Sequence, residues 1–319
     1  MMAFDIEKPQ SSPRRGRLAF LRTKRAIAVL AVLAIVSVVL IALGATHVLT
    51  PRSSSDSNDD NPGKWQPKNS SMIADGTPLR IMCLGASIVI GEYSSDLNGF
   101  RDTFRAELEK LGAPINMVGS KRYGRMADND LEAYPGNRVG QLHDHVTDGI
   151  VSKLKPNVFV INVGTNNVIQ RRETDVAGQQ MEALIDFLLG ASPRATVVLS
   201  TLLTNTLPNR KPLILDINRQ FRELVKKYDE KPVVLAELHP SEGLPGRPQA
   251  EDIGRDGSHP TEKGYEIMGR LLAQAVQDAD AKGYLRWPED GVAYDGEIGR
   301  ADATGTQSTV SSPSKTTTS

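Results

Sequence analysis

The sequence predicts a three-layer α/β/α sandwich, in which five parallel strands form a sheet with helices on both faces, preceded by one transmembrane helix. Through the middle of the chain, short apolar runs alternate with longer segments of helical periodicity, and this alternation is typical of a parallel sheet with crossover helices. The third run, 158–163, is apolar at nearly every position, as expected for a strand buried on both faces. Nearer the N-terminus, residues 26–45 are uncharged and long enough to cross a bilayer.

The apolar runs predict strands, in chain order, at 79–85, 115–119, 157–163, 195–201 and 232–237. Helical segments are expected between and after them at 99–111, 138–153, 174–190, 211–230 and 261–283. In the first helix, Phe100, Phe104 and Leu108 recur at helical spacing, and Gly112 is a typical stop. Because ligands of such sheets bind beyond the carboxyl ends of the strands, the loops after the strands are where chemistry is expected.

The N-terminal region predicts a type II single-pass membrane protein. Basic residues crowd the segment 1–25, which the positive-inside rule assigns to the cytosol as a basic tail. The apolar stretch is too long for the core of a cleaved signal peptide and lacks the polar face of a soluble helix. Residues 26–46 are therefore expected to be a transmembrane signal anchor, with the catalytic domain extracellular or lumenal.

Composition divides the rest of the chain. Residues 47–77 are rich in Ser, Asp, Asn and Pro and predict a flexible stalk, 78–286 predict the folded domain, and 287–319 predict a disordered Ser/Thr-rich tail. The 38 basic and 38 acidic residues cancel, so no nucleic-acid partner is expected. Cys83 is the only cysteine, which excludes an intrachain disulfide, and its place in the first strand predicts a buried apolar role.

Three residues at predicted strand ends suggest acyl chemistry. Ser87 follows the first strand, and Asp256 and His259 lie three positions apart on one loop before the last helix. A serine hydroxyl attacks an ester only when a base takes its proton, and a histidine needs a carboxylate to hold its tautomer. This combination predicts an ester hydrolase with Ser87, His259 and Asp256 as catalytic residues. His239 also follows a strand but has no acid three residues before it.

Other loop residues could stabilise charge or contact the substrate. Acyl transfer places negative charge on the former carbonyl oxygen, and the N–H groups of Ser87 and Gly119 with the Asn166 amide could form the oxyanion hole. The connection 121–138 is long, which fits substrate binding. Within it Tyr134 is a candidate substrate contact, as is Asn167 beside Asn166.

These residues together resemble the SGNH (GDSL-like) hydrolase superfamily over residues 78–285. Ser87 matches the nucleophile block of that superfamily, Gly119 its glycine block, Asn166 its Gly-x-Asn block, and Asp256/His259 its Asp-x-x-His block. The resemblance implies the flavodoxin-like SGNH fold and an acyl-enzyme mechanism that needs no metal or organic cofactor. Ser87 lacks the second glycine of Gly-x-Ser-x-Gly, which disfavours an ordinary α/β-hydrolase.

Within the superfamily, the finer likeness is to carbohydrate esterase family 3 and to fungal secreted members, on stretches such as 84–88, 98–101, 116–120, 134–136 and 256–260. It implies deacetylation of sugar esters. Ala86 and Asn167 stand where the superfamily usually has Asp, which bears on how well the loops are supported and on the rate. Two alternatives stay open: a lysophospholipase- or thioesterase-type lipid acyl hydrolase, and a catalytically weak sugar-binding module.

Overall fold

The computed structural model describes residues 72–290. The predicted cytosolic tail (1–25), the signal anchor (26–46), nearly all of the stalk (47–77) and the tail beyond residue 290 lie outside the described residues. Within 72–290, none of the helices combines the length and the hydrophobicity that a membrane crossing requires. The architecture described below is therefore that of the folded domain.

In the described part of the chain, seven strands form one mixed sheet in the order β3-β4-β1-β5-β6-β7, with β2 also paired to β1. The strands span Leu79–Gly85 (β1), Ile115–Met117 (β2), Lys121–Arg122 (β3), Asp130–Ala133 (β4), Val158–Asn162 (β5), Thr196–Ser200 (β6) and Val233–Ala236 (β7). All pairs are parallel except β3 with β4. The parallel strands bring their carboxyl ends to one edge of the sheet.

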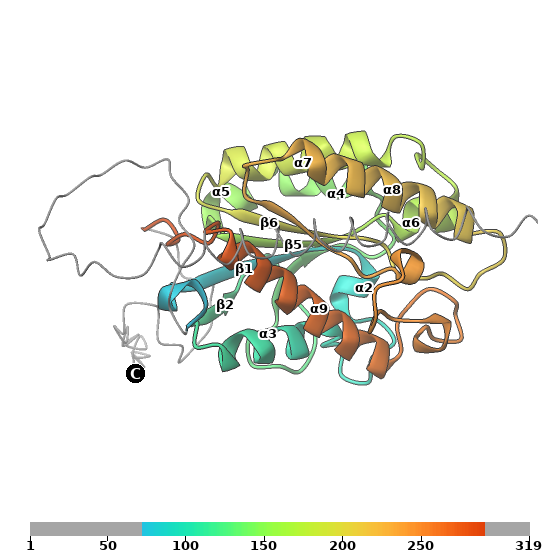
Figure 1. Cartoon of the computed structure of the whole chain (residues 1–319), viewed down its shortest axis with the longest axis horizontal. Coiled ribbons are helices and arrows are strands. Elements are labelled where there is room, and N and C mark those ends of the chain that lie inside the picture. The colour runs from blue at the N-terminus through green and yellow to red at the C-terminus, as the bar shows by residue number, and fades with distance from the viewer. Residues whose placement is uncertain (1–71, 291–319) are drawn as a thin grey trace, which may run out of the picture. The chain divides into compact units, whose positions relative to one another are not determined.

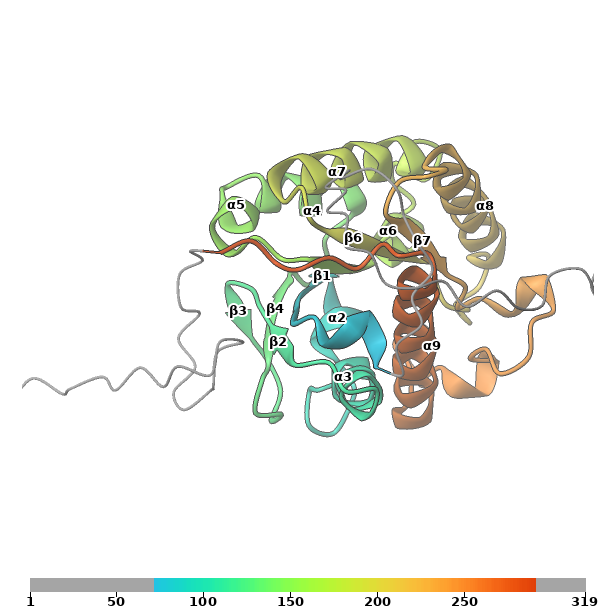
Figure 2. The ribbon, with the colours of Figure 1, turned by 60° about the vertical axis from the view of Figure 1, so that its left-hand side comes forward.

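Helices cover both faces of the sheet (Figures 1 and 2). One face carries α4 (Val139–Val146), α5 (Ile150–Leu154), α7 (Ala177–Ala191) and α8 (Lys211–Lys227), and the other carries α3 (Phe100–Lys110) and α9 (Glu262–Ala281). Two short helices, α2 (Ser87–Ile90) and α6 (Thr165–Gln170), follow β1 and β5 directly.

The alternation of side chains along β1 explains the two layers of core. Ile81 and Cys83 point into the cluster with α3 and α9, whereas Met82 and Leu84 point into the cluster with α7 and α8. All four side chains are fully buried. Cys83 is thus an apolar core residue, as expected, and burial raises the pKa of its thiol to about 12.

The predicted α/β fold with parallel strands is confirmed, but the count of five strands is wrong. All five predicted strands appear within two residues of their predicted ends. The connection 121–138 was expected to be a long loop, yet it contains β3 and β4. The predicted helix 138–153 is also divided into α4 and α5, because Gly149 adopts a left-handed φ of 93° between them.

The folded domain extends slightly beyond residues 78–286 at both ends. Ile73 and Ala74 are buried in a 3₁₀ turn (Ile73–Gly76), and the Ala74 N–H donates to Asp280 of α9 over 2.9 Å. At the other end, Arg80 donates to the Glu289 carbonyl over 3.2 Å, and Arg194 donates to the Pro288 carbonyl over 3.3 Å. The last few residues that were assigned to the stalk therefore pack on the domain.

Candidate active site

Ser87 is the first residue of α2, directly after the turn that ends β1. The turn requires glycine at position 85, since a Cβ there would lie 2.2 Å from the Asn162 carbonyl oxygen and 2.4 Å from Val89. The chain therefore leaves the sheet in close contact with β5. This places the Ser87 hydroxyl at the carboxyl edge of the sheet.

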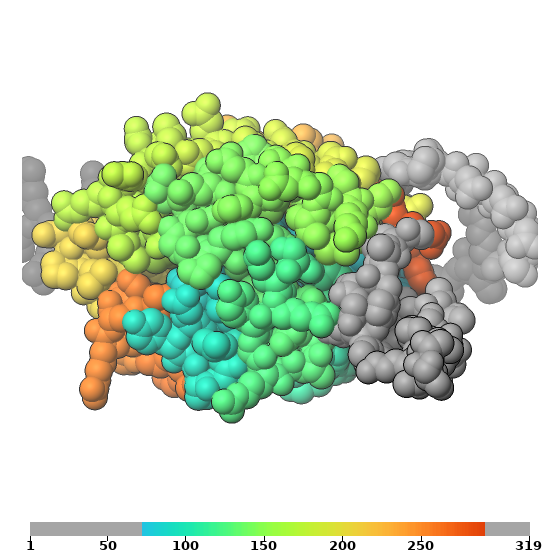
Figure 3. All heavy atoms as spheres, turned by 180° about the vertical axis from the view of Figure 1, so that it is seen from behind, coloured from blue at the N-terminus to red at the C-terminus, as the bar shows by residue number. Residues whose placement is uncertain are grey.

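The structure brings Ser87 and His259 together although 172 positions separate them in the sequence. The Ser87 hydroxyl donates to His259 Nε2 over 2.8 Å, and His259 Nδ1–H donates to Asp256 Oδ2 over 2.5 Å. The carboxylate thereby holds the ring in the tautomer whose Nε2 accepts a proton. Figure 3 shows the orange segment around residue 250 against the cyan segment that follows β1.

A tight loop presents Asp256 and His259 on one side. Gly257 adopts a left-handed φ of 79°, and the Gly254 N–H donates to the His259 carbonyl over 2.7 Å. Burial raises the pKa of Asp256, but hydrogen bonds from the His259 ring and from the N–H groups of His259 and Ser258 outweigh it and hold that pKa below its ordinary value. The stabilisation from this carboxylate is complete above its unfolded-state pKa and is lost as the pH falls through its folded-state value.

A small pocket of about 10 Å³ lies beside Ser87, between the loops that follow β1 and β5. Its lining comprises Ala86, Ser87, Ile88, Asn162, Val163, Gly164, Thr165 and Asn166. Asn166 Nδ2 donates to the Asn137 carbonyl over 3.1 Å, which fixes the amide and leaves its second N–H for a ligand. Ser87 and Asn166 are thus placed together as the sequence predicted.

Gly119 requires a correction. In the register of β1 and β2, Met117 lies beside Ile81, so Gly119 falls near the level of Cys83 rather than at the end of β1. A Cβ at Gly119 would lie 2.1 Å from the Leu131 carbonyl oxygen, so this glycine allows β4 to pack closely. It is β4 that reaches the end of β1, where the Tyr134 N–H donates to the Gly85 carbonyl over 3.0 Å. The structure does not bring Gly119 to the serine.

Asn167 also has a different place from the one expected. Its side chain is fully buried; Oδ1 accepts from the Val139 N–H over 3.1 Å, and Nδ2 donates to the Arg172 and Glu173 carbonyls. It therefore cannot contact a substrate. It supports the loop after β5 instead, and an aspartate could not donate these last two hydrogen bonds.

Tyr134 is held by its own neighbours. Its hydroxyl donates to Glu132 over 2.5 Å, and its ring stacks on His145 with 3.8 Å between the centroids. Burial and the hydrogen bond to Glu132 raise the pKa of Tyr134 to about 12. The polar end of this side chain is occupied within the domain, and Tyr134 is not among the residues that line the pocket beside Ser87.

Two residues that the sequence did not single out contact His259. A Glu92 carboxylate oxygen lies 3.8 Å from His259 Nε2, and the Tyr93 ring stacks on the imidazole with 4.7 Å between centroids. Tyr93 is 67% exposed and has a left-handed φ of 70°, which is costly for a residue with a Cβ. The Tyr265 hydroxyl of α9 donates to the Glu92 carbonyl over 2.7 Å and fixes this turn. An exposed aromatic ring held in a strained conformation beside the histidine points to a role in the site.

We expect Tyr93→Gly to stabilise the fold while it weakens catalysis. The strain energy that glycine relieves at this left-handed position should exceed the entropic cost of glycine by about 0.5–1 kcal/mol. Losing the ring that fixes one face of the imidazole should lower kcat/KM for a test ester such as p-nitrophenyl acetate about 3- to 10-fold. Thermal unfolding and turnover measure the two effects.

Leu97→Gly is the matched control, because Leu97 lies in the same loop, is exposed and has a φ of 58°. This variant should gain similar stability and keep its activity. Equal activity losses in both variants would show that the loop backbone, rather than the Tyr93 ring, matters.

The chain is similar to known proteins over most of its described residues. The model of the GDSL-like lipase/acylhydrolase family matches residues 83–267. A "Multidomain esterase" of Ruminococcus flavefaciens is 26% identical over 245 residues, which is 67% of this chain, and the chain spans 29% of that relative's length.

Solved structures give the same fold. A carbohydrate esterase family 3 protein from Talaromyces cellulolyticus matches with a TM-score of 0.54 and 22% identity, over 63% of this chain and 99% of that one. A family 3 carbohydrate esterase from Clostridium thermocellum matches with a TM-score of 0.55 and 21% identity, over 63% of this chain and 96% of that one.

Proposed function

The chain belongs to the GDSL-like lipase/acylhydrolase family, and on this premise we propose that it is a serine carboxylic-ester hydrolase that removes acetyl groups from carbohydrates. The observation that carries the proposal is the hydrogen-bonded series Ser87, His259 and Asp256 beside a pocket of about 10 Å³. The three residues supply an activated nucleophile, and the small pocket limits the size of the acyl group.

The geometry supports an acyl-enzyme mechanism. His259 Nε2 accepts the Ser87 proton as Oγ attacks the ester carbonyl carbon, and Asp256 stabilises the imidazolium that forms. The Ser87 N–H and the Asn166 amide donate to the oxyanion. His259 then donates the proton to the leaving alcohol. Water, deprotonated by the same imidazole, attacks the acyl-enzyme and releases the acid and the free serine.

The acyl side of the site favours acetate. Space for one water needs roughly 10–15 Å³, so the pocket beside Ser87 has room for little more than a methyl group. A long acyl chain would require a long apolar channel, whereas this pocket is small and mixes the polar residues Asn162, Thr165 and Asn166 with Ala86, Ile88 and Val163. The lipid acyl hydrolase alternative is therefore less well supported.

The alcohol side favours a sugar. The Tyr93 ring is largely exposed next to His259, and Glu92 offers a carboxylate beside the reacting atoms. Aromatic rings commonly supply an apolar platform with little loss of entropy, and a carboxylate accepts hydrogen bonds from hydroxyl groups. The substrate class in the names of the two solved neighbours motivates the same choice.

We expect activity on p-nitrophenyl esters to fall steeply with acyl length. The small pocket has no room for the two additional methylene groups of a butyryl ester. Overfilling a packed site costs about 1–3 kcal/mol, so kcat/KM for the butyrate should be at least about tenfold below that for the acetate. Acetate release from acetylated xylan, with lysophosphatidylcholine as the competing substrate, tests the class of alcohol. Faster turnover of octanoate or of the lysolipid would reject acetyl specificity.

We also propose that residues 26–46 anchor the enzyme in a membrane, with the catalytic domain on the outer or lumenal side. The support is the uncharged apolar stretch and the basic cluster before it. The full-length chain should stay with the membrane fraction after alkaline carbonate washing, and deletion of 1–46 should release it. Release of the full-length chain by carbonate would reject the anchor.

A further inference from the structure

A second and much larger cavity opens at the same edge of the sheet, after β6 and β7. Its volume is about 620 Å³. The lining residues come from the loop after β6, the start of α8, and the segment that follows β7: Thr204, Asn205, Thr206, Lys211, Ile214, Leu215, His239, Pro240, Ser241, Gln249 and Ala250. The mechanism proposed above uses none of them.

His239 offers a hydrogen-bond donor at this cavity. The residue is only 5% exposed, and its Nδ1 accepts from the Ser241 N–H over 3.0 Å. Because Nδ1 is an acceptor, the proton of the neutral ring resides on Nε2, which has no partner among residues 72–290. Burial lowers the pKa of His239, so the ring stays neutral and keeps this tautomer.

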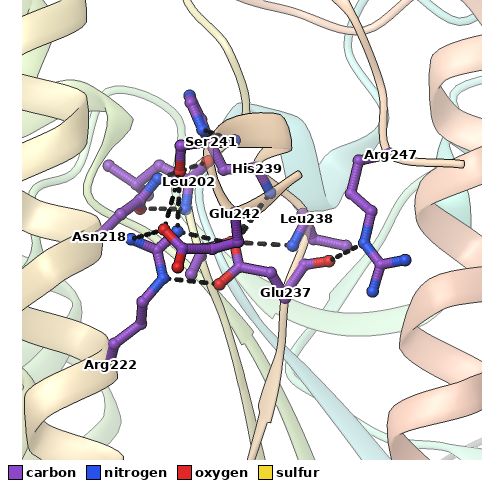
Figure 4. Close-up of polar contacts among 10 residues, drawn as sticks. Leu202, Asn218, Arg222, Glu237, Leu238, His239, Ser241, Glu242 and Arg247 are labelled. Carbon is purple, nitrogen blue, oxygen red and sulfur yellow. Dashed lines mark hydrogen bonds and ion pairs between the residues drawn. The ribbon is translucent and has the colours of Figure 1, made fainter. Parts of the chain in front are cut away.

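A charged network fixes the backbone that carries His239 (Figure 4). Arg222 of α8 donates to both carboxylate oxygens of Glu237, over 2.7 and 3.0 Å, and to Ser241 Oγ over 3.1 Å. The His239 N–H donates to Glu237 over 3.2 Å, and Arg247 Nε donates to the Glu237 carbonyl over 3.0 Å. The segment is therefore held in place before any ligand binds, which lowers the cost of binding.

The residues that line the cavity include one cation and no carboxylate. Lys211 supplies an ammonium group, and no Asp or Glu is among the lining residues. Asn205 Oδ1 already accepts the Leu207 N–H over 3.0 Å. The lining hydroxyl groups of Thr204, Thr206 and Ser241 can donate or accept, so the Lys211 ammonium and the His239 Nε2–H decide the preference. Because both of these groups donate only, the cavity suits an anion.

Three of the lining residues, Ile214, Leu215 and Pro240, supply aliphatic carbon. Such carbon can cover the C–H face of a ring, and the volume has room for a sugar unit. We propose that this cavity binds an acidic sugar, a uronate unit of the polysaccharide substrate, with its carboxylate toward Lys211 and His239. This inference rests on the proposed function, because it places the second site on the same chain as the acetyl ester.

The cavity shares a wall with the catalytic loop. Asn205 Nδ2 donates to Ser258 Oγ over 2.9 Å, and the Thr206 N–H donates to the Gly257 carbonyl over 2.9 Å. Ser258 and Gly257 lie between the catalytic Asp256 and His259. The lining of the cavity is thus hydrogen-bonded directly to the loop that carries the acid and the base.

Calorimetric titration of the full-length chain tests the proposal without turnover. The ligands are an unacetylated xylo-oligosaccharide with one glucuronic acid and the same oligosaccharide without it. We expect the acidic ligand to bind about tenfold more tightly, the effect of one or two hydrogen bonds to a charged group. Lys211→Ala should remove this preference, and His239→Phe should reduce it. Lys226→Ala, at the far exposed end of α8, is the control that should keep it.

Equal affinity for the two oligosaccharides, or equal effects of Lys211→Ala and Lys226→Ala, would overturn the inference. Binding of inorganic phosphate without binding of the acidic oligosaccharide would overturn it too. A chain that binds the acidic oligosaccharide more tightly but releases no acetate from xylan would support the cavity assignment and reject the proposed function. A chain that releases acetate but binds both oligosaccharides equally would support the proposed function and reject the cavity assignment.

Discussion

Replacing Ser87 by alanine is expected to lower kcat for p-nitrophenyl acetate by at least about four orders of magnitude, as the loss of the nucleophile does in other serine hydrolases. The hydroxyl donates to His259 over 2.8 Å, and in the proposed mechanism it forms the acyl-enzyme. Alanine removes a single oxygen, so the fold should remain intact. Burst-phase and steady-state turnover measure the effect.

Ser95→Ala is the matched control, since Ser95 is an exposed serine in the neighbouring loop. It should keep full activity and should still react with a fluorophosphonate at Ser87. Equal turnover by wild type and Ser87→Ala would end the assignment of the nucleophile. A wild-type chain that binds carbohydrate but resists the fluorophosphonate would instead favour the weak sugar-binding module.

Replacing Arg101 by leucine is expected to reduce the free energy of unfolding by about 3–5 kcal/mol. This guanidinium is fully buried on α3, and burial lowers its pKa. Its hydrogens satisfy five main-chain carbonyls from three segments, namely those of Val89, Ile90, Leu97, Tyr123 and Asn129. Leucine fills part of the volume but leaves the carbonyls without donors, and unpaired buried acceptors are costly.

Urea unfolding of Arg101→Leu and Arg270→Leu makes the comparison. Arg270 is an exposed arginine of α9 that pairs with Glu266 at the surface, so its loss should cost at most about 1 kcal/mol. Because the Val89 and Ile90 carbonyls belong to the segment after Ser87, Arg101→Leu should also lower activity below the unfolding midpoint. A change below about 1 kcal/mol would show that water replaces the guanidinium.

The sequence predicted the apolar strands and the loops that follow them, because both depend on hydrophobic pattern and on order along the chain. Nearly continuous apolar runs located β1 and β5 to within a residue, because strands buried on both faces exclude polar residues almost completely. Ser87 and the pair Asp256/His259 could be assigned to one edge, since parallel strands bring their carboxyl ends together. These predictions needed the direction of each strand and no side-chain geometry.

Other features depend on contacts that a pattern does not contain. Glu132 is a fully buried glutamate in a four-residue strand, so β4 lacked the apolar signal by which strands are recognised. Because β4 was not predicted, Gly119 was assigned to the end of the strand next to β1 and therefore to the oxyanion hole. Tyr93 gave no signal either, because a left-handed φ is rare for tyrosine and the sequence around it reads as an ordinary turn. The Gly91 and Gly99 that flank this loop were its only local marker.

The separation of Ser87 from His259 by 172 positions has a consequence for synthesis of the protein. The nucleophile leaves the ribosome early, whereas its base arrives only just ahead of α9, the helix whose Gly269 packs against the Phe100 carbonyl of α3. A nascent or prematurely terminated chain therefore carries an inert hydroxyl. Hydrolytic activity therefore reports that translation has passed α9 and that α9 has docked against α3.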